Sequence, residues 1–222
     1  MKSASFWKFF DNEAAPQLAF RASTFRRTFE YLDTVEGRLT IVETGCTREV
    51  GNWQGDGQST LLFDKYVSTR DSESLCVTVD ISESSVATCR AIVSSRVSVN
   101  QDDSVVFLGN FANEARAANR RIDLLYLDSF DLDRSHWYPS AIHHLKELTA
   151  AIRCLHERSL VVVDDCPLNA DFVPVSGDNI TLLGPALVGG KGRLVAEYAN
   201  AVAAKLEFSE YQAGWTSMVK DV

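Results

Sequence analysis

The chain has 222 residues, of which 45% are hydrophobic and 23% charged, which suits one globular domain with a full core. Its formal net charge of -8 argues against a nucleic-acid partner, because phosphate contacts need a basic surface. No signal peptide is visible, and no apolar run approaches the ~20 residues of a membrane span. The five cysteines are odd in number and none has C-x-x-C spacing, which favours reduced thiols. We therefore expect a cytoplasmic protein with no nucleic-acid or membrane partner.

Residues 1–37 are expected to be helical and to form an N-terminal extension. Phe6, Phe10, Phe25 and Phe29 recur at roughly helical spacing, and Pro16 divides the segment into two helices. Such a segment packs on a sheet edge or covers the site. The pattern predicts a helical lid or extension over residues 1–37 and a ligand-binding domain over residues 38–222.

Strand-like and helix-like runs alternate after residue 37. The strands are Val-, Leu- and Ile-rich along their whole length, which is typical of a parallel sheet buried on both faces. The fold class that follows is α/β: a Rossmann-like, doubly wound, mostly parallel seven-stranded sheet with a C-terminal antiparallel hairpin. The expected strands are Leu39–Glu43, Leu75–Asp80, Val105–Leu108, Ile122–Asp128, Leu160–Asp165 and the hairpin arms Leu206–Tyr211 and Trp215–Val219. The expected helices are Gln58–Ser68, Ser82–Val93, Phe111–Ala118, Pro139–Arg158 and Lys191–Lys205.

The stretch from Leu39 to Val67 reads as buried strand, loop and helix, and it is the expected cofactor pocket. In an open α/β sheet, small ligands bind where strands end and helices begin. Gly45 and Gly57 let the backbone approach a ligand, and the following helix start offers free N–H groups.

Four of the expected strands end in acidic residues, so carboxylates should lie in a row along one edge of the sheet. Asp80 is placed to grip the two hydroxyls of a ribose, with helix capping as the alternative. Asp128, Asp164 and Asp165 supply hard oxygen ligands that suit Mg²⁺, with solvated loop acids as the alternative.

With these features the chain resembles class I S-adenosylmethionine-dependent methyltransferases over roughly residues 38–222. More narrowly, it resembles the metal-dependent O-methyltransferases related to catechol O-methyltransferase and to the macrolide sugar enzymes. Glu43-Thr44-Gly45 is similar to the first motif of that family, and Gly57-Gln58-Ser59 to the Gly-x-Ser that opens its first helix. The resemblance implies S-adenosylmethionine as cofactor, held by Glu43, Gly45, Gly57 and Ser59, with Asp80 on the ribose and Asn110 near the adenine.

The resemblance also implies that Asp128, Asp164 and Asp165 hold a divalent metal such as Mg²⁺, with Asp165 in place of the family's Asn. Two features depart from the family pattern. The loop Cys46–Asp56 is inserted after the first motif, and Asp131 stands where catechol-type enzymes have a catalytic Lys.

A different general base is therefore needed. His136, in the loop after Asp128, is the best-placed candidate. His143 and His144 on the following helix are the other candidates, although packing or capping explains them as well. Lys191 could reach an anionic substrate.

Together these features predict methyl transfer from S-adenosylmethionine to a small molecule, at a hydroxyl oxygen and with help from Mg²⁺. Asp128 and His136 are the expected catalytic residues. Two other interpretations stay open: a non-catalytic module that binds the cofactor or a nucleotide, and an oxidoreductase on a similar sheet. The first motif lacks G-x-G-x-x-G, which weakens the oxidoreductase interpretation. A homodimer is compatible with the sequence, which does not identify the methyl acceptor.

Overall fold

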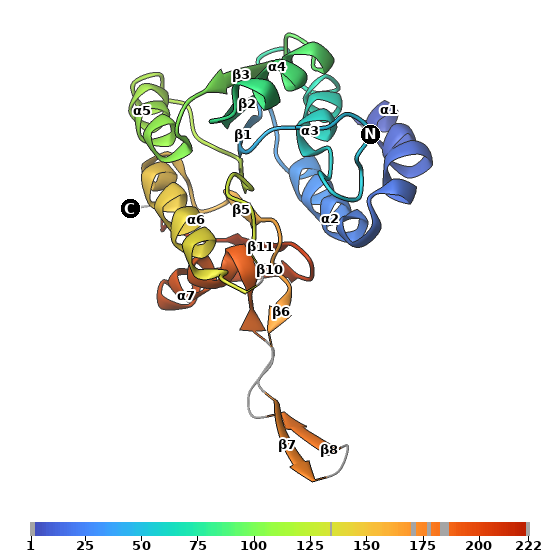
Figure 1. The fold of residues 1–222 in the computed structure, drawn as a ribbon. Helices are drawn as coiled ribbons and strands as arrows, with labels where there is room; N and C mark the ends of the chain where they lie inside the picture. The colour runs from blue at the N-terminus through green and yellow to red at the C-terminus, as the bar shows by residue number, and fades with distance from the viewer. Residues whose placement is uncertain (1–2, 134, 170–171, 177–178, 183–186, 221–222) are drawn as a thin grey trace.

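A seven-stranded sheet forms the centre of the protein (Figure 1). The computed structural model describes residues 3–133, 135–169, 172–176, 179–182 and 187–220. The strands follow the order β10-β11-β5-β4-β1-β2-β3. Strands β1 to β5 are parallel, β11 is antiparallel to β5, and β10 is antiparallel to β11. The predicted fold class is confirmed. The strand bounds are β1 Thr40–Thr44, β2 Leu75–Asp80, β3 Val97–Gln101, β4 Leu124–Leu127, β5 Leu160–Val163, β10 Lys205–Ser209 and β11 Ala213–Thr216.

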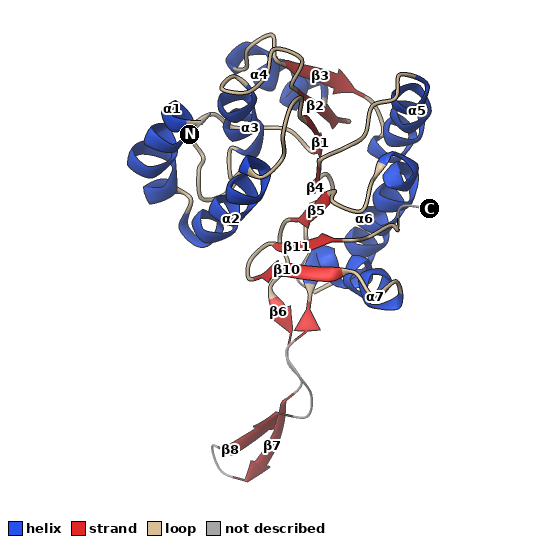
Figure 2. Ribbon diagram, turned by 180° about the vertical axis from the view of Figure 1, so that it is seen from behind, coloured by secondary structure: helices blue, strands red, loops and turns tan. Residues whose placement is uncertain are grey.

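Helices cover both faces of this sheet, as the view from behind also shows (Figure 2). Alternate residues of each central strand point to opposite faces. Ile41 packs into the core cluster that holds α1 to α4, whereas its neighbour Val42 packs into the cluster that holds α5 to α7. This alternation explains why the strands are apolar along their whole length. The helix bounds are α1 Ala4–Phe9, α2 Ala22–Asp33, α3 Ser59–Val67, α4 Glu83–Ile92, α5 Ser104–Ala117, α6 Tyr138–Ala151 and α7 Arg193–Ala201.

The N-terminal segment is helical, as predicted, and it packs on one face of the sheet rather than on its edge. A π-helical turn at Phe10–Ala14 and 3₁₀ turns at Ala15–Gln17 and Ala19–Arg21 join α1 to α2. Phe25 stacks on Tyr126 of β4 at 5.8 Å between ring centroids, and Phe29 lies 6.0 Å from Phe63 of α3. These aromatic rings are buried together in one core cluster. The segment and the sheet therefore share a hydrophobic core.

The predicted third strand, Val105–Leu108, is wrong, because these residues lie in α5. Asp103 caps that helix, and its carboxylate accepts hydrogen bonds from the backbone N–H groups of Val105 and Val106, each at 3.0 Å. The strand lies earlier in the chain, at β3, where only Val97 and Val99 face the core. An edge strand needs few apolar residues, so its pattern is weaker than the apolar run inside the helix.

The segment after β5 leaves the body of the molecule. Strand β6 (Leu168–Asn169) pairs with β9 (Leu187–Val188), and between them the hairpin of β7 (Phe172–Ser176) and β8 (Asn179–Leu182) extends outward in Figure 1. The chain returns through a 3₁₀ turn at Gly190–Gly192, which leads into α7. None of the helices in the described residues is both long and apolar enough to cross a membrane.

Candidate active site

A cavity of about 280 Å³ opens at the carboxyl ends of β1, β2 and β4. Its walls come from the loops that follow these strands and from the first residues of α3 and α4. The lining includes five polar or glycine positions of interest, namely Gly45, Arg48, Ser59, Asp80 and Asp128. Strand order reverses beside β1, which is the point of a doubly wound sheet where ligands bind.

Gly45 is required by the close approach of two loops. Its φ of +78° is in the left-handed region, and an added Cβ would lie 2.6 Å from the backbone oxygen of Asp128. Its N–H donates a hydrogen bond to the carbonyl of Val79 at 2.8 Å. The glycine therefore brings the ends of β1 and β4 close together under the cavity.

Asp80 ends β2 with its carboxylate held in a fixed orientation. The backbone N–H of Ser82 donates to Oδ1 at 2.8 Å, and the N–H of Cys46 donates to Oδ2 at 3.3 Å. No cation pairs with Asp80 among the residues that the structure describes. The carboxylate faces the cavity with lone pairs left to accept hydrogen bonds from a ligand.

A second cavity, of about 330 Å³, continues past Asp80. It shares Asp80, Ile81 and Ser129 with the first cavity, so the two form one cleft. Ile81 and Phe130 line it although both are exposed to solvent, at 73% and 45%. Exposed apolar side chains on the walls of a narrow cavity suit a flat, mostly apolar ligand group.

A polar network that the sequence did not reveal lies under this second cavity. His143 Nε2 lies 2.9 Å from the hydroxyl of Ser104 and 3.3 Å from the carboxylate of Glu147. Glu147 is fully buried and also accepts hydrogen bonds from Thr44 and Ser129. The hydrogen bond to Glu147 raises the pKa of His143 above its usual value. The i, i+4 spacing of His143 and Glu147 on one helix was the available signal.

Glu43 lies beneath the cleft rather than in its wall. It is completely buried, Thr60 donates a 2.6 Å hydrogen bond to its Oε2, and its Oε1 has no partner among the described residues. Burial raises the pKa of Glu43 to about 7, against the opposing hydrogen bonds of Ser59 and Thr60. It therefore supports Ser59 and Thr60 at the start of α3.

Three other predicted site residues lie outside the cleft. Gly57 is buried against Arg21, whose Cδ would be 3.1 Å from an added Cβ. Asn110 is exposed on α5, because the strand that would have placed it near the cleft is part of this helix. His136 is also at the surface, with 82% of its side chain exposed and a contact to Asp133. None of the three lines the cavities described here.

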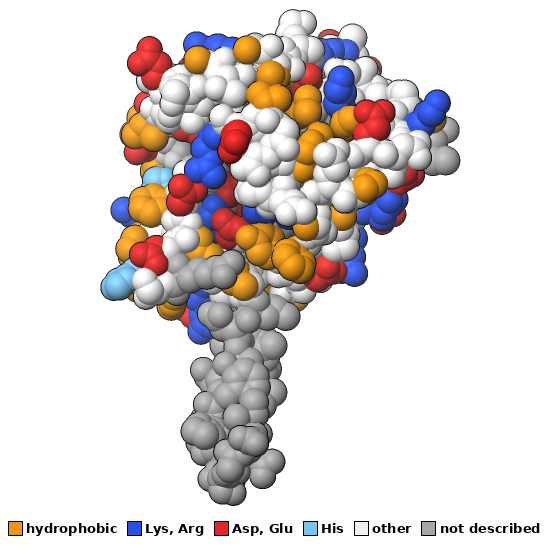
Figure 3. Space-filling view, turned by 45° about the vertical axis from the view of Figure 1, so that its right-hand side comes forward, with side chains coloured by type: hydrophobic (Ala, Val, Ile, Leu, Met, Phe, Trp, Pro, Cys, Tyr) orange, Lys and Arg blue, Asp and Glu red, His pale blue; other side chains and the backbone are white. Residues whose placement is uncertain are grey.

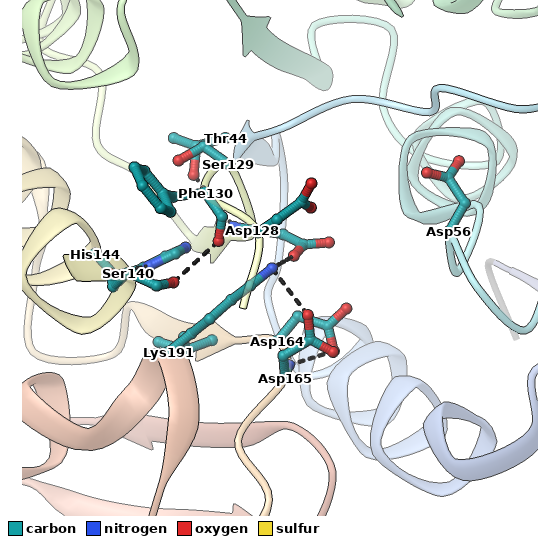
Figure 4. Close-up of polar contacts among 12 residues, drawn as sticks. Thr44, Asp56, Asp128, Ser129, Phe130, Ser140, His144, Asp164, Asp165 and Lys191 are labelled. Atoms are coloured by element: carbon teal, nitrogen blue, oxygen red, sulfur yellow. Dashed lines mark hydrogen bonds and ion pairs between the residues drawn. The ribbon is translucent and has the colours of Figure 1, made fainter. Parts of the chain in front are cut away.

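Asp128, Asp164 and Asp165 do come together, as predicted, but a lysine lies between Asp128 and Asp165 (Figure 4). Lys191 extends from the turn before α7 with 2% of its side chain exposed. Its Nζ contacts Oδ1 of Asp128 and lies 3.0 Å from Oδ2 of Asp165. Gly190 makes this approach possible, because an added Cβ would lie 2.1 Å from the backbone oxygen of Asp165.

Arg21, from the N-terminal segment, is the second cation in the same cluster. Its Nε donates to Oδ2 of Asp164 at 2.8 Å, and its Nη2 lies 3.3 Å from Oδ1 of Asp165. The guanidinium also packs over the ring of Tyr211 at 4.7 Å, and the Tyr211 hydroxyl donates to Asp165 Oδ1 at 2.5 Å. Two cations thus neutralise much of the charge of three carboxylates.

The pKa values of the cluster reflect this pairing. Burial alone would lower the pKa of Lys191, but Asp128 and Asp165 outweigh it and raise the pKa, so the ammonium stays charged. Burial raises the pKa of Asp128 well above its ordinary value, against the pull of Lys191. For Asp165, Lys191 and the hydrogen bond from Tyr211 outweigh the burial, and its pKa is lowered.

This cluster does not fit a divalent metal. Every carboxylate of the three already has a protein cation on at least one oxygen, at the distances given above. In the part of the chain that the structure describes, no three His, Cys, Asp or Glu side chains are arranged to hold a metal ion. The sequence supplied the carboxylates but gave no indication that Lys191 and Arg21 lie among them.

A third cavity, of about 450 Å³, lies on the other side of the cluster. Asp165, Arg21 and Tyr211 form one wall, and Gln54 and Gly55 of the inserted loop form another. Arg48 lines both this cavity and the first one, and it pairs with Asp56 and Asp131. Figure 3 shows acidic and basic side chains intermingled around a hollow on this face.

The chain is similar in structure to known methyltransferases. The O-methyltransferase from Bacillus cereus, in complex with SAH, matches with 13% identity and a TM-score of 0.50, over 97% of this chain and 90% of that one. The O-methyltransferase TomG from Streptomyces achromogenes, involved in tomaymycin synthesis and in complex with SAM, matches with 15% identity and a TM-score of 0.48, over 97% and 88%. No family model and no curated protein matches the sequence. At 13% identity the first likeness shows that the fold is of the Rossmann-like methyltransferase type.

Proposed function

We propose that the protein transfers a methyl group from S-adenosylmethionine to an oxygen of a small-molecule acceptor. The observation that carries this proposal is the continuous cleft at the point where strand order reverses, with Asp80 in its middle and Asp128 at its end. S-adenosylmethionine has a flat adenine, a ribose and a cationic sulfonium, and the cleft offers a matching feature for each.

The adenine would lie in the second cavity, between Ile81 and Phe130 and close to Ser104. The ribose hydroxyls would donate to the carboxylate of Asp80, which the backbone already holds in place. The methionine end would lie over Gly45, near Ser59 at the start of α3. Asp80, which pairs with no cation among the described residues, favours a ligand that carries positive charge in the first cavity.

The acceptor would lie in the third cavity, with its oxygen next to the acidic cluster. A methyl transfer forms an O–CH₃ bond as the S–CH₃ bond breaks, and the sulfonium becomes a neutral thioether. The acceptor hydroxyl must lose its proton. Asp128 is the best-placed base, because it lines the cavity of the cofactor and its Oδ2 has no hydrogen-bond partner among the described residues. Its raised pKa favours proton uptake.

Calorimetry with S-adenosylmethionine and with NAD, on the same preparation, tests the proposal. We expect saturable heat with S-adenosylmethionine and none with NAD. Binding of NAD alone would favour the oxidoreductase, and the absence of heat with S-adenosylmethionine would reject methyl transfer.

A further experiment separates an enzyme from a binding module. The protein is incubated with methyl-labelled S-adenosylmethionine and a panel of hydroxylated small molecules, and SAH is measured. We expect acceptor-dependent SAH, because a third cavity adjoins the cluster at Asp165. A protein that binds the cofactor yet never forms SAH with any acceptor would be a binding module.

A further inference from the structure

We infer that Lys191 and Arg21 occupy the place of a divalent cation, so that the acidic cluster is complete without a metal. The part of this inference that concerns ion binding stands on the geometry of the cluster alone. Its consequence for catalysis, a transfer that needs no metal, rests on the proposed function.

The first support is the position of the Lys191 ammonium. It sits between carboxylates from the ends of two adjacent strands, Asp128 after β4 and Asp165 after β5, as a shared metal ion would. Figure 4 shows the side chain extended toward both of them. The stem of Lys191 is buried, and its ammonium contacts Asp128, which lines the cleft, and Asp165, which lines the third cavity.

The second support is that Arg21 satisfies the third carboxylate. Asp164 is almost fully buried, and Oδ1 and Oδ2 lie 3.1 and 2.8 Å from the Nε of Arg21. The backbone N–H of Asp165 also donates to Oδ1 of Asp164 at 2.8 Å. Both oxygens of this buried carboxylate therefore already accept from a protein cation, which offsets the cost of burying its charge without a metal.

The third support is the charge of the cluster. Lys191 and Arg21 place two positive charges among the three acidic side chains, the same charge as one divalent ion. A metal added to the intact cluster would have to displace a buried ammonium or sit beside it, and both are costly. The protein cations therefore exclude the ion they replace.

The two cations also give the two accessible acids, Asp165 and Asp128, different surroundings. Asp165 accepts contacts from Lys191, Arg21 and Tyr211, so its oxygens are engaged. Asp128 contacts Lys191 through Oδ1 only, and it lines the cofactor cavity. The arrangement leaves one oxygen of one acid available to an acceptor, next to a permanent positive charge.

The experiment measures Mn²⁺ binding by electron paramagnetic resonance, because free Mn²⁺ gives a signal that bound Mn²⁺ loses. We expect no saturable binding to the wild-type protein. Lys191→Ala leaves the three carboxylates with Arg21 as their remaining cation. It should bind Mn²⁺ saturably and at least about tenfold more tightly than any residual binding by the wild type, since ligand charge sets the affinity of such sites. Lys191→Arg keeps the charge and should resemble the wild type.

Lys205→Ala is the matched control, because Lys205 lies on the edge strand β10 and forms an exposed ion pair with Glu207 of the same strand. It should not gain Mn²⁺ binding. Should Lys191→Ala fail to fold, Lys191→Gln keeps a hydrogen-bonding side chain without the charge and is expected to gain affinity in the same way.

Stoichiometric Mn²⁺ binding to the wild-type protein would overturn the inference. So would the absence of any gain in both neutral variants, because Lys191 would then be an ordinary ion-pair partner. Calorimetry with S-adenosylmethionine on the same samples keeps the two proposals apart. A protein that binds the cofactor and also Mn²⁺ rejects only this inference, whereas one that binds neither rejects the proposed function.

Discussion

Two acidic positions on the same edge of the sheet have opposite surroundings. Asp80, at the end of β2, accepts from two backbone N–H groups and the Cys46 thiol, pairs with no cation among the described residues, and faces the cleft. Asp164 and Asp165, after β5, receive Arg21, Lys191 and Tyr211. Both positions follow a buried parallel strand, so the sequence patterns around them look alike.

The difference comes from segments that are remote in the chain. Arg21 belongs to the N-terminal helices, and Lys191 to the turn before α7. An acid that meets no cation stays available to a ligand, whereas an acid that meets two becomes part of the scaffold. Asp128 lies between these extremes, with one oxygen on Lys191 and 21% of its side chain exposed.

The largest expected effect is on catalysis at this intermediate position. Asp128→Asn should lower the rate of methyl transfer about 10²–10⁴-fold, because it removes the proposed base and leaves the shape of the side chain. The affinity for S-adenosylmethionine should change little. Asp133→Asn, on the exposed loop nearby, is the control. If Asp128→Asn weakened only the affinity for the cofactor, Asp128 would be a cofactor-binding residue like Asp80 and not the base.

Removing a buried cation should have the largest effect on stability. Lys191→Met leaves Asp128 without a cation and Asp165 with Arg21 as its remaining cation, and it should cost about 3–5 kcal/mol of unfolding free energy. Urea unfolding measures this, with Lys205→Met expected within about 0.5 kcal/mol of the wild type because its pair is exposed. Equal losses of unfolding free energy in Lys191→Met and Lys205→Met would show that the buried ion pairs of Lys191 stabilise the protein no more than an exposed pair does.

Glu43 predicts how stability depends on pH. Its pKa of about 7 in the folded protein exceeds the ordinary value of 4.5, so the folded chain keeps a proton that the unfolded chain has lost. Its contribution to stability is complete below pH 4.5 and is lost as the pH rises through about 7. Glu43→Gln removes this dependence.

Thermal and urea unfolding at pH 5 and at pH 8 measure the effect. Relative to the wild type, Glu43→Gln should be more stable at pH 8 than at pH 5 by about 2.5 kcal/mol. Glu197→Gln, on the exposed side of α7, should leave the profile unchanged. A parallel profile for Glu43→Gln and the wild type would show that Glu43 is ionised in the folded protein.

Most of the fold could be predicted from the sequence, because local patterns carry it. The alternation of buried strands and amphipathic helices identified β1, β2, β4 and β5 and the hairpin. The error at residues 105–108 arose because four apolar residues suit a strand and a helix equally well. The cap at Asp103 was the local signal that separates them.

The site was only partly predictable, because its cations come from far away in the chain. The strand-end acids are local features, and the structure brings Asp128, Asp164 and Asp165 together as expected. Arg21 lies 143 residues from Asp164 in sequence, and Lys191 lies 63 residues from Asp128. No spacing rule reports such contacts, so the cluster looked like a metal site.

The role of Asp80 is tested by measuring the binding of S-adenosylmethionine. Asp80→Ala should weaken the affinity for S-adenosylmethionine about 10–100-fold, because hydrogen bonds to a charged group contribute about 1.5–3 kcal/mol each. The melting temperature should fall only slightly, since the side chain loses hydrogen bonds from two backbone N–H groups but no ion pair among the described residues. Asp102→Ala, in the turn between β3 and α5, is the control in calorimetry. Normal cofactor affinity in Asp80→Ala would contradict the ribose assignment.

The smallest effect is expected at Arg48, which offers a direct comparison with Arg21. Both arginines line the third cavity and each pairs with two carboxylates. However, 6% of the Arg21 side chain is exposed and 51% of that of Arg48. Exposed pairs contribute about 0–1 kcal/mol, so Arg48→Ala should cost no more than this, whereas Arg21→Ala should cost about 3 kcal/mol or more.

Hydrogen exchange adds a local readout to these unfolding measurements. Arg48 joins the inserted loop to Asp131 in the loop after β4, so Arg48→Ala should speed exchange in residues 46–56 and leave β1 and β4 protected. Arg21→Ala should instead lower protection across the shared core, because Arg21 holds the N-terminal helices to Asp164. Equal unfolding costs for the two variants would mean that burial does not separate the two kinds of charge on this edge of the sheet.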